Sequence, residues 1–208
     1  MTLLALEFSS DRRSVALARG GVVLAEAVQQ TASRATDALG LIEKVLADAK
    51  ISREEIEVIA VGLGPGSYTG IRAAIAVAQG WQLARGVQLL GVSSMEAMAA
   101  QAQAENFFGR VNVVVDAQRG EFYLGTWEIC ADGRVELVPL KIVAAAEIEA
   151  LKVAGETCVG PGHSGFFPAA AAVARLAAGQ GGFVSGADLR PVYLRETTFL
   201  KSAQSRVI

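Results

Sequence analysis

One segment of this sequence has the residue types and the setting of a phosphate-binding loop. The segment, here called the glycine loop, reads GPGSYTG over residues 64–70 and stands between the apolar run 58–61 and the alanine-rich run 71–85. If the first run is a strand and the second a helix, backbone N–H groups at the start of the helix face any anion that the loop holds. The residues that would line such a site are Gly64, Gly66, Ser67, Thr69, Gly70 and Arg72.

The glycine loop departs from the two common nucleotide-binding motifs. A Walker A loop has a lysine directly before its Ser or Thr, whereas here Tyr68 precedes Thr69. The dinucleotide fingerprint requires a third glycine where Thr69 stands. A strand-to-helix turn that binds nothing explains the glycines equally well, so both interpretations stay open. Arg72 pairs either with a phosphate or with an acidic neighbour such as Glu7.

The side chains that usually catalyse hydrolysis or bind metals are sparse. His163 is the only histidine, so metal sites with two histidines are excluded. The two cysteines form no CxxC pair, and no GxSxG nucleophile elbow is present. We therefore predict no catalytic residue and no metal ligand in this chain.

The composition is that of a globular protein. Of the 208 residues, 52% are hydrophobic and 19% are charged, and the formal net charge is −2. A chain without a broad positive field is not expected to bind nucleic acid strongly by itself. No signal peptide is recognised, and the longest uncharged run, 157–174, contains prolines and glycines that a membrane-spanning helix tolerates poorly. We predict a cytoplasmic protein that does not enter the membrane.

The first half of the chain alternates strand and helix patterns. The expected elements are, in order, strands over 3–8, 14–19 and 22–28, a helix over 38–49, a strand over 58–61, a helix over 71–85 and a strand over 89–92. Ser33 or Thr36 is the expected cap of the first helix, and Gly86 is the expected C′ residue of the second.

The second half repeats this order. Strands over 111–115, 122–129 and 135–143 precede a helix over 144–151, a strand that ends at Val159, a second Gly-Pro-Gly turn and a helix over 168–178. The repeat predicts two related lobes, 1–103 with the glycine loop and 104–208, with a cleft between them. An α/β protein that alternates by chance is the alternative.

Small residues cover more than one face of the expected helix 71–85. They are Ala73, Ala74, Ala76, Ala78 and Gly80, and Trp81 stands beside them. Small side chains let another helix approach closely. Packing within the chain and a helix-to-helix contact with another protein are equally supported.

The segment over 58–72, VIAVGLGPGSYTGIR, closely resembles the signature of the TsaB (YeaZ-like) family of bacterial tRNA threonylcarbamoyladenosine biosynthesis proteins. Further matching segments lie at 3–17, 91–97, 116–123 and 191–195, so the resemblance covers nearly the whole chain. It implies a two-lobed α/β fold of the actin-like ATPase (ASKHA) class, with a duplicated ribonuclease H-like motif of β-meander plus helices. The family was grouped with glycoprotease-like M22 proteins and lacks peptidase activity.

The resemblance also implies a function in tRNA modification. In this family the catalytic paralogue TsaD transfers a threonylcarbamoyl group to the adenosine beside the anticodon of tRNA. A TsaB-like chain is its non-catalytic partner, which docks and activates it, and the ATPase TsaE joins the assembly. ATP and magnesium are thus expected at the level of the complex, tRNA is reached through the complex, and no cofactor is predicted for this chain alone. Without its partners the same face is expected to form a homodimer.

The resemblance places the partner contact on the helices 35–50 and 71–85. The residues carried over to this interface are Leu39, Ile42, Leu46, Ala73, Ala74, Val77 and Trp81.

Two departures from the family pattern bear on nucleotide binding. The family's first strand usually ends in Asp-Thr-Ser, but this chain has Glu7-Phe8-Ser9, and a histidine expected near Ala35 is missing. Phe8 would place a ring where a small hydroxyl meets a phosphate, which favours a lobe that packs over one that binds ATP. The alternative function is an ATP-dependent phosphotransferase or hydrolase of the actin-like superfamily, with Glu7 or Asp116 near magnesium.

Overall fold

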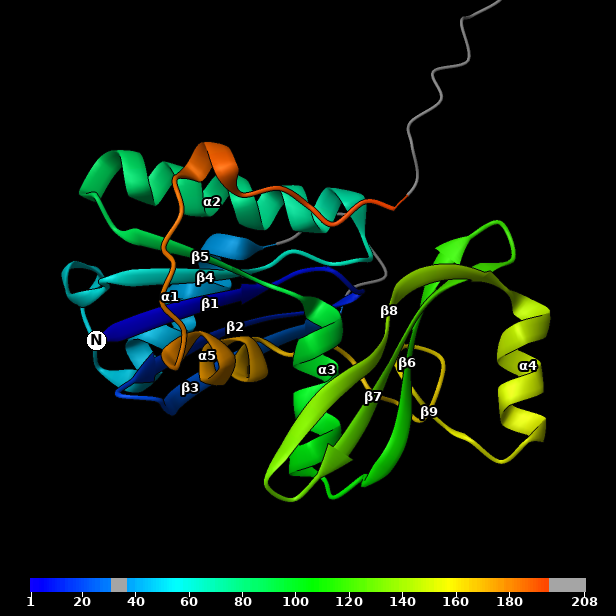
Figure 1. Cartoon of the computed structure of the whole chain (residues 1–208). Helices are drawn as coiled ribbons and strands as arrows, with labels where there is room; N and C mark the ends of the chain where they lie inside the picture. Colours follow the sequence, from blue (N-terminus) through cyan, green and yellow to red (C-terminus); the bar gives the residue numbers. More distant parts are fainter. Residues whose placement is uncertain (31–36, 195–208) are drawn as a thin grey trace, which may run out of the picture.

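The computed structural model describes residues 1–30 and 37–194, which form two lobes side by side (Figure 1). Each lobe is built on one β-sheet, and helices cover both faces of each sheet. Among the described residues, no helix combines the length and the apolar character that crossing a bilayer requires. The two-lobed α/β architecture expected from the sequence is confirmed.

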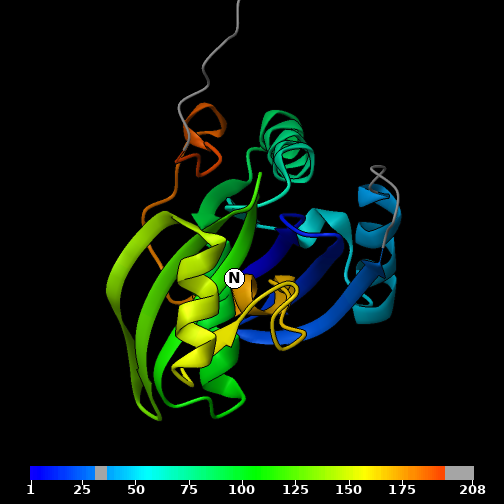
Figure 2. The same ribbon diagram turned by 90° about the vertical axis from the view of Figure 1, so that its right-hand side faces the viewer.

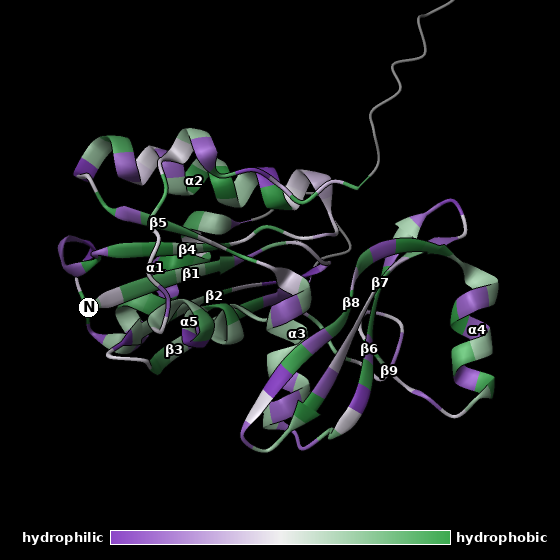
Figure 3. Cartoon of the chain, in the orientation of Figure 1, coloured by the Kyte–Doolittle hydropathy of each residue, from purple (hydrophilic) through white to green (hydrophobic). Residues whose placement is uncertain are grey.

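The first lobe contains a five-stranded sheet in the order β3-β2-β1-β4-β5. Its strands are β1 (Thr2–Glu7), β2 (Arg12–Arg19), β3 (Val22–Gln30), β4 (Val58–Gly62) and β5 (Gln88–Val92). β1 pairs antiparallel with β2 and parallel with β4. β1 and β4 are buried along their whole length, because both faces of the sheet are covered. Figure 3 shows that hydrophobic residues, coloured green, predominate along these central strands.

Two helices cover one face of the first sheet, and a third covers the other. α1 (Ala38–Ala49) and α2 (Tyr68–Arg85) share a buried cluster with Leu6 of β1. α5 (Ala170–Ala178) packs on the opposite face, in a cluster that contains Ala5. Successive side chains of β1 therefore point to opposite clusters, as the two-residue period of a strand requires.

The ends of α1 and α2 follow ordinary capping rules. Asp37 caps α1 through its side chain, whereas Ser33 and Thr36, the caps expected from the sequence, lie outside the described residues. α2 begins three residues before its expected start, because the Ser67 hydroxyl caps it from within the glycine loop. Gly86 ends α2 with a φ of 70°, which confirms its expected role.

The second lobe repeats the plan with a four-stranded sheet in the order β8-β7-β6-β9. Its strands are β6 (Gly109–Gln118), β7 (Glu121–Cys130), β8 (Gly133–Ala144) and β9 (Thr157–Val159). β6 pairs antiparallel with β7 and parallel with β9, which is the relation that β1 has to β2 and β4. The duplicated β-meander expected from the sequence is confirmed.

α3 (Ser94–Ala104) lies between the two sheets (Figure 1). Met95 and Met98 pack on the second sheet, while Ala97 belongs to the cluster of the first. The sequence patterns do not predict this helix, because it is buried on most sides and lacks the polar face of an amphipathic helix. On the outer face of the second sheet, α4 (Ala145–Val153) faces the viewer in Figure 2.

Two late segments return to the first lobe. α5 packs on the first sheet, and residues 183–194, here called the C-terminal segment, run along α2 (Figure 1). Val184 N donates to Leu89 O at 2.9 Å. Gly186 exchanges hydrogen bonds with two glutamine side chains of α2. The lobe boundary at 103/104 stays a prediction: it separates the two sheets, but it falls in the last turn of α3, and α5 lies on the lobe before it.

The N-terminus of α5 is held by side chains of the first sheet. Ala170 N donates to Ser14 Oγ at 2.8 Å, and Ala171 N donates to Glu26 Oε1 at 3.0 Å. The N-cap residue Ala169 has no side chain that accepts a hydrogen bond. Two residues more than a hundred positions earlier therefore cap α5 and attach it to the first lobe.

Ser14→Ala should lower the free energy of unfolding by about 1–2 kcal/mol, because it leaves the buried Ala170 N–H without its acceptor. Urea unfolding followed by circular dichroism measures the loss. Ser10→Ala is the control, since the Ser10 hydroxyl lies in an exposed turn and should cost about 0.5 kcal/mol or less. Equal effects of the two substitutions would contradict the capping role.

Candidate functional site

The glycine loop lies where β1, α2 and α3 meet, and three of its N–H groups, those of Gly64, Ser67 and Gly70, are bonded within the chain. Gly64 N donates to Ser94 Oγ at 3.1 Å, and Ser94 N donates back to Gly64 O at 3.0 Å. Ser67 N donates to Ser9 O at 2.6 Å. Gly70 N donates to Ser67 Oγ at 3.3 Å. A phosphate bound to any of these three N–H groups would have to replace the bond that the group makes, which weakens the interpretation of the loop as an anion site.

Two glycines of the loop bring it against the end of β1. A Cβ on Gly66 would overlap the carbonyl oxygen of Ser9, and a Cβ on Gly70 would overlap that of Phe8. Gly66 also has a φ of 150°, a conformation that L residues rarely adopt. The glycines therefore let backbone approach backbone, and this geometry favours the turn over the phosphate loop.

Glu7 is fully buried at the end of β1. Its Oε2 accepts from Ser94 Oγ at 2.7 Å, and its Oε1 accepts from Ser9 N at 2.8 Å. The carboxyl fills the space that a Cβ on Gly62 would occupy. Burial raises the pKa of Glu7, and hydrogen bonds from Ser9 and Ser94 partly oppose the rise. Glu7 therefore connects β1 to α3, and its oxygens are not free to hold magnesium.

Ser94 is a site residue that the sequence does not identify. It lies 87 positions from Glu7, and no local pattern indicates that the two side chains meet. The only local signal is the helix cap at Ser93, which accepts from Glu96 N at 3.4 Å and would have placed a helix start at this point.

Phe8 contributes to the core and not to a ligand site. Its ring is fully buried in the cluster between the first sheet and α1 and α2. Position 8 points to the same face as Leu4 and Leu6, so the ring packs in the core. The expectation that Phe8 serves packing agrees with this placement.

Arg72 contacts a tyrosine and not an acidic neighbour. Its guanidinium lies 5.3 Å from the centre of the Tyr68 ring, and its Nη1 donates to the Tyr68 hydroxyl at 3.1 Å. Since Glu7 is buried beneath the loop, the suggested pair between Arg72 and Glu7 does not form. Thr69 is exposed in the first turn of α2.

Asp116 lies near the end of β6, and His163 lies in the turn that follows β9. Asp116 accepts from Gln118 N at 2.7 Å and from Gln118 Nε2 at 3.1 Å. The His163 ring meets the edge of Phe122 at 5.9 Å, and burial lowers the pKa of His163. Across residues 1–30 and 37–194, no three His, Cys, Asp or Glu side chains gather as metal ligands. The geometry gives no support to an enzyme with Glu7 or Asp116 beside magnesium.

The residues carried over to the partner interface divide between core and surface. Ile42, Leu46 and Ala74 are buried within their own lobe. These three have little surface left for a partner, because the apolar stripe of each helix faces its own sheet. Of the others, Leu39 is 64% exposed, and the half-buried ones are Ala73, Val77 and Trp81. Those four stay predicted contacts.

A groove of about 330 Å³ lies between α1 and α2. Its apolar lining comes from Leu39, Ile42, Trp81 and Ala84, and its charged lining from Glu43, Arg53, Glu54 and Arg85. Two ion pairs stand at its rim, Arg53 to Glu43 at 3.1 Å and Arg85 to Glu54 at 3.2 Å. An apolar centre with a charged rim is the usual composition of a protein contact surface.

Comparison with known proteins identifies relatives over most of the chain. Residues 3–182 match the family model described as "TsaD: tRNA N6-adenosine threonylcarbamoyltransferase". The Escherichia coli (strain K12) protein named tRNA threonylcarbamoyladenosine biosynthesis protein TsaB is 33% identical over 128 residues, which are 62% of this chain and 55% of that protein. The Bacillus subtilis (strain 168) protein of the same name is 29% identical over 165 residues, 78% of this chain and 71% of that one. The matched part thus spans little more than half of the first relative.

A solved structure resembles the fold over nearly its full length. The structure titled "YeaZ from Pseudomonas aeruginosa" superposes with a TM-score of 0.77 at 25% identity, and the match covers 93% of this chain and 99% of that one. The two lobes and their covering helices are therefore arranged as in that protein.

Gly66→Ala should lower the free energy of unfolding by about 2–4 kcal/mol, because a disfavoured φ combines with overlap on a backbone oxygen that cannot move freely. Gly120→Ala is the matched control: φ is 76° there, but no atom lies within 4 Å of the added Cβ. Its cost should be about 1 kcal/mol, from the backbone conformation alone. Chemical denaturation compares them, and similar losses would contradict the close approach of the loop to β1.

Glu7→Gln should change the pH dependence of stability. The unfolded chain, with the ordinary carboxyl pKa of 4.5, releases this proton at lower pH than the folded chain, in which the pKa is raised. The residue's contribution to stability is therefore lost as pH rises from about 4.5 through the raised pKa, and the Gln variant should gain stability relative to the natural chain over that window.

Urea midpoints at pH 4.5, 6 and 8 measure this difference. Glu43→Gln, which removes an exposed carboxylate on α1, is the control. Its urea midpoint should differ from that of the natural chain by the same amount at all three pH values. If the midpoint difference between Glu7→Gln and the natural chain is also the same at all three pH values, protonation of the buried carboxyl does not contribute to stability.

Proposed function

We propose, since the chain belongs to the TsaD family and is of its TsaB (YeaZ) type, that it is a non-catalytic subunit required for threonylcarbamoyl transfer to tRNA. In this role it docks a TsaD-type catalytic paralogue, which modifies the adenosine beside the anticodon, and stabilises the active form of that paralogue. The following features of its surface and its core support the proposal.

The polar residues of the first lobe serve the fold. Glu7 and Ser94 are buried and bonded to each other, and the N–H groups of Gly64, Ser67 and Gly70 in the glycine loop are bonded within the chain. This is the arrangement expected of a relative that has kept the fold of an enzyme and uses its loop for packing.

The observation that carries the proposal is the outer surface of α2. Ala73, Ala76, Gly80 and Leu83 follow one another at spacings of three and four and so share one face, here called the α2 outer stripe. Gly80 is exposed, and no other part of the described chain lies within 4 Å of the place of its Cβ. Leu83 is 89% exposed.

Packing within the chain gives no reason for a glycine at position 80. A glycine inside a helix costs about 0.5–1 kcal/mol of stability relative to alanine. The close approach of a second helix does give a reason, because small residues let two helix backbones come together. Beside the stripe, the groove between α1 and α2 offers Leu39 and Trp81 as apolar anchors for the partner.

The proposal extends to the other members of the assembly. A TsaE-type ATPase acts with the pair, so that ATP and magnesium are used by the complex, and tRNA reaches this chain as part of that cytoplasmic complex. When the paralogue is absent, two copies of this chain pair through the same stripe, because a paralogue and a second copy present related helical surfaces.

Gly80→Leu should separate folding from docking. Leucine forms helix better than glycine, so the isolated chain should gain about 0.5–1 kcal/mol of stability. The larger side chain should keep a partner helix away and weaken binding to a TsaD-type protein by about tenfold or more. Light scattering and calorimetric titration measure complex formation, and a reconstituted assay measures threonylcarbamoyladenosine in tRNA.

Ala150→Leu is the matched control, since it adds a leucine to an exposed position of α4 in the other lobe. It should leave both binding and tRNA modification unchanged. If the natural chain forms no complex with a TsaD-type partner in the presence of ATP and magnesium, or if Gly80→Leu binds as well as the natural chain, the proposed docking surface is wrong.

A further inference from the structure

Two tyrosines and an arginine gather at the start of α2, from segments far apart in the sequence. The rings of Tyr68 and Tyr193 stack with centroids 5.4 Å apart and an angle of 27° between their planes. Arg72 lies over the Tyr68 ring and bonds its hydroxyl. We call these three residues the tyrosine–arginine cluster. Tyr68 is a residue of the glycine loop, but the cluster takes no part in the hydrogen bonds that hold the loop against β1 and α3. The cluster is also separate from the α2 outer stripe.

The stacked rings are not needed to hold the C-terminal segment in place. Val184 N bonds to β5, and Val192 N donates to Leu63 O at 2.9 Å. Gly186 bonds to two side chains of α2, and Leu189 is buried in the core of the first lobe. These contacts hold the C-terminal segment at several points from residue 184 to residue 192. The need to attach the segment therefore does not explain why Tyr193 stacks on Tyr68.

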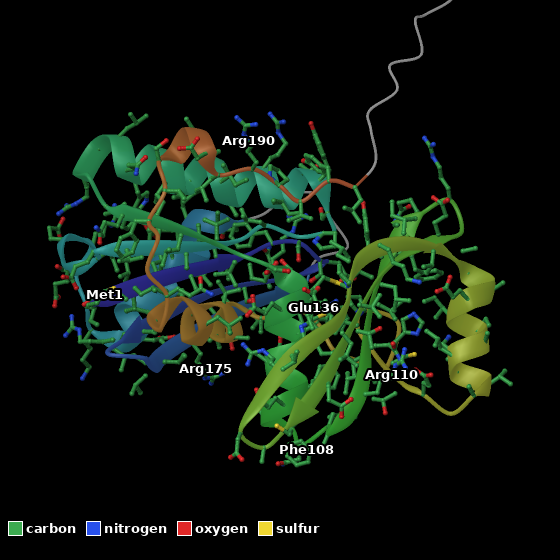
Figure 4. All side chains as sticks on the ribbon, in the orientation of Figure 1. Met1, Phe108, Arg110, Glu136, Arg175 and Arg190 are labelled. Carbon is green, nitrogen blue, oxygen red and sulfur yellow. The ribbon has the colours of Figure 1, made fainter. Side chains whose placement is uncertain are left out.

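The cluster leaves much of its aromatic surface exposed to solvent. Tyr68 is 54% exposed and Tyr193 is 45% exposed. Within the described residues the guanidinium of Arg72 contacts Tyr68 and forms no ion pair. Figure 4 shows a second cation, Arg190 of the C-terminal segment, beside α2. The result is an exposed aromatic surface with the Arg72 guanidinium beside it.

We infer that the tyrosine–arginine cluster binds RNA directly: an unstacked base of the tRNA packs against the exposed tyrosine surface, and its phosphate meets Arg72. The inference rests on the proposed function and gives this subunit a contact of its own with the substrate. Aromatic rings and arginine planes are the groups on which proteins stack splayed bases. The α2 outer stripe, by contrast, is apolar and uncharged, as a protein partner requires.

The overall charge of the chain fits a shared contact. A net charge of −2 provides no general attraction for RNA, so the isolated chain should bind tRNA weakly. A stacking contact adds affinity once the rest of the complex has brought the tRNA close. The effect should therefore be measured on the assembled complex.

The test uses the full chain bound to its TsaD-type and TsaE-type partners, with an unmodified tRNA transcript as the probe. Tyr193→Ala and Tyr68→Ala should each weaken tRNA binding by about 5- to 100-fold, the range seen when a stacking ring is removed. Tyr193→Phe keeps the ring and should bind within about twofold of the natural chain. Arg72→Ala should reduce the slope of log Kd against the logarithm of the salt concentration by about one, because one contact with a phosphate is lost.

Phe183→Ala is the matched control, because it removes an exposed ring from the same segment, outside the cluster. It should leave tRNA binding unchanged. If the tyrosine variants bind tRNA as the natural complex does, the inference is wrong. It is also wrong if those variants lose the protein partners, since the cluster would then be a protein contact.

Failure of the proposed function would be seen separately, as the absence of a complex with the natural chain. In that case, ultraviolet cross-linking of the tRNA to the isolated chain still decides the inference. Cross-links mapped to Tyr68 or Tyr193 support it, and cross-links confined to other residues overturn it.

Discussion

Glu7 stands where β1, the glycine loop and α3 meet, and the hydrogen bonds to its carboxyl fix the relation of these three elements. Ser94 links it to α3 and, through Gly64, to the loop. Gly66 and Gly70 then allow the loop and α2 to press against the last carbonyls of β1. The direction of α2 follows from this arrangement, and so does the surface that α2 presents. A motif with the appearance of a nucleotide site thus orients a helix.

The second constraint is the way the duplicated lobes are joined. α3 is buried between both sheets, and α5 crosses back to the first sheet, where Ser14 and Glu26 cap it. Each sheet consequently has helices on both faces, and the apolar strand surfaces are covered. The surfaces left for partners are the outer sides of helices, above all that of α2, together with the aromatic cluster at its start.

The sequence predicts much of this fold, because strands and amphipathic helices have local periodic patterns. The duplicated order and the end of α2 at Gly86 follow from such patterns. These patterns do not predict α3, since a helix buried on most sides has no polar face. Local patterns also do not predict which residues the glycine loop contacts, because Glu7 and Ser94 meet only in the folded chain. Periodicity also identifies the apolar face of a helix without showing whether it covers the chain's own sheet or a partner.

The central claim, that this chain contributes a docking surface and not a catalytic group, is tested most directly by hydroxyl-radical footprinting with a TsaD-type partner. Leu83 of α2 and Val153 of α4 are both 89% exposed, so they should react similarly in the isolated chain, and Val153 serves as an internal reference. The account predicts that the partner protects Leu83 strongly and leaves Val153 unchanged. Equal reactivity of Leu83 with and without a bound partner would contradict it.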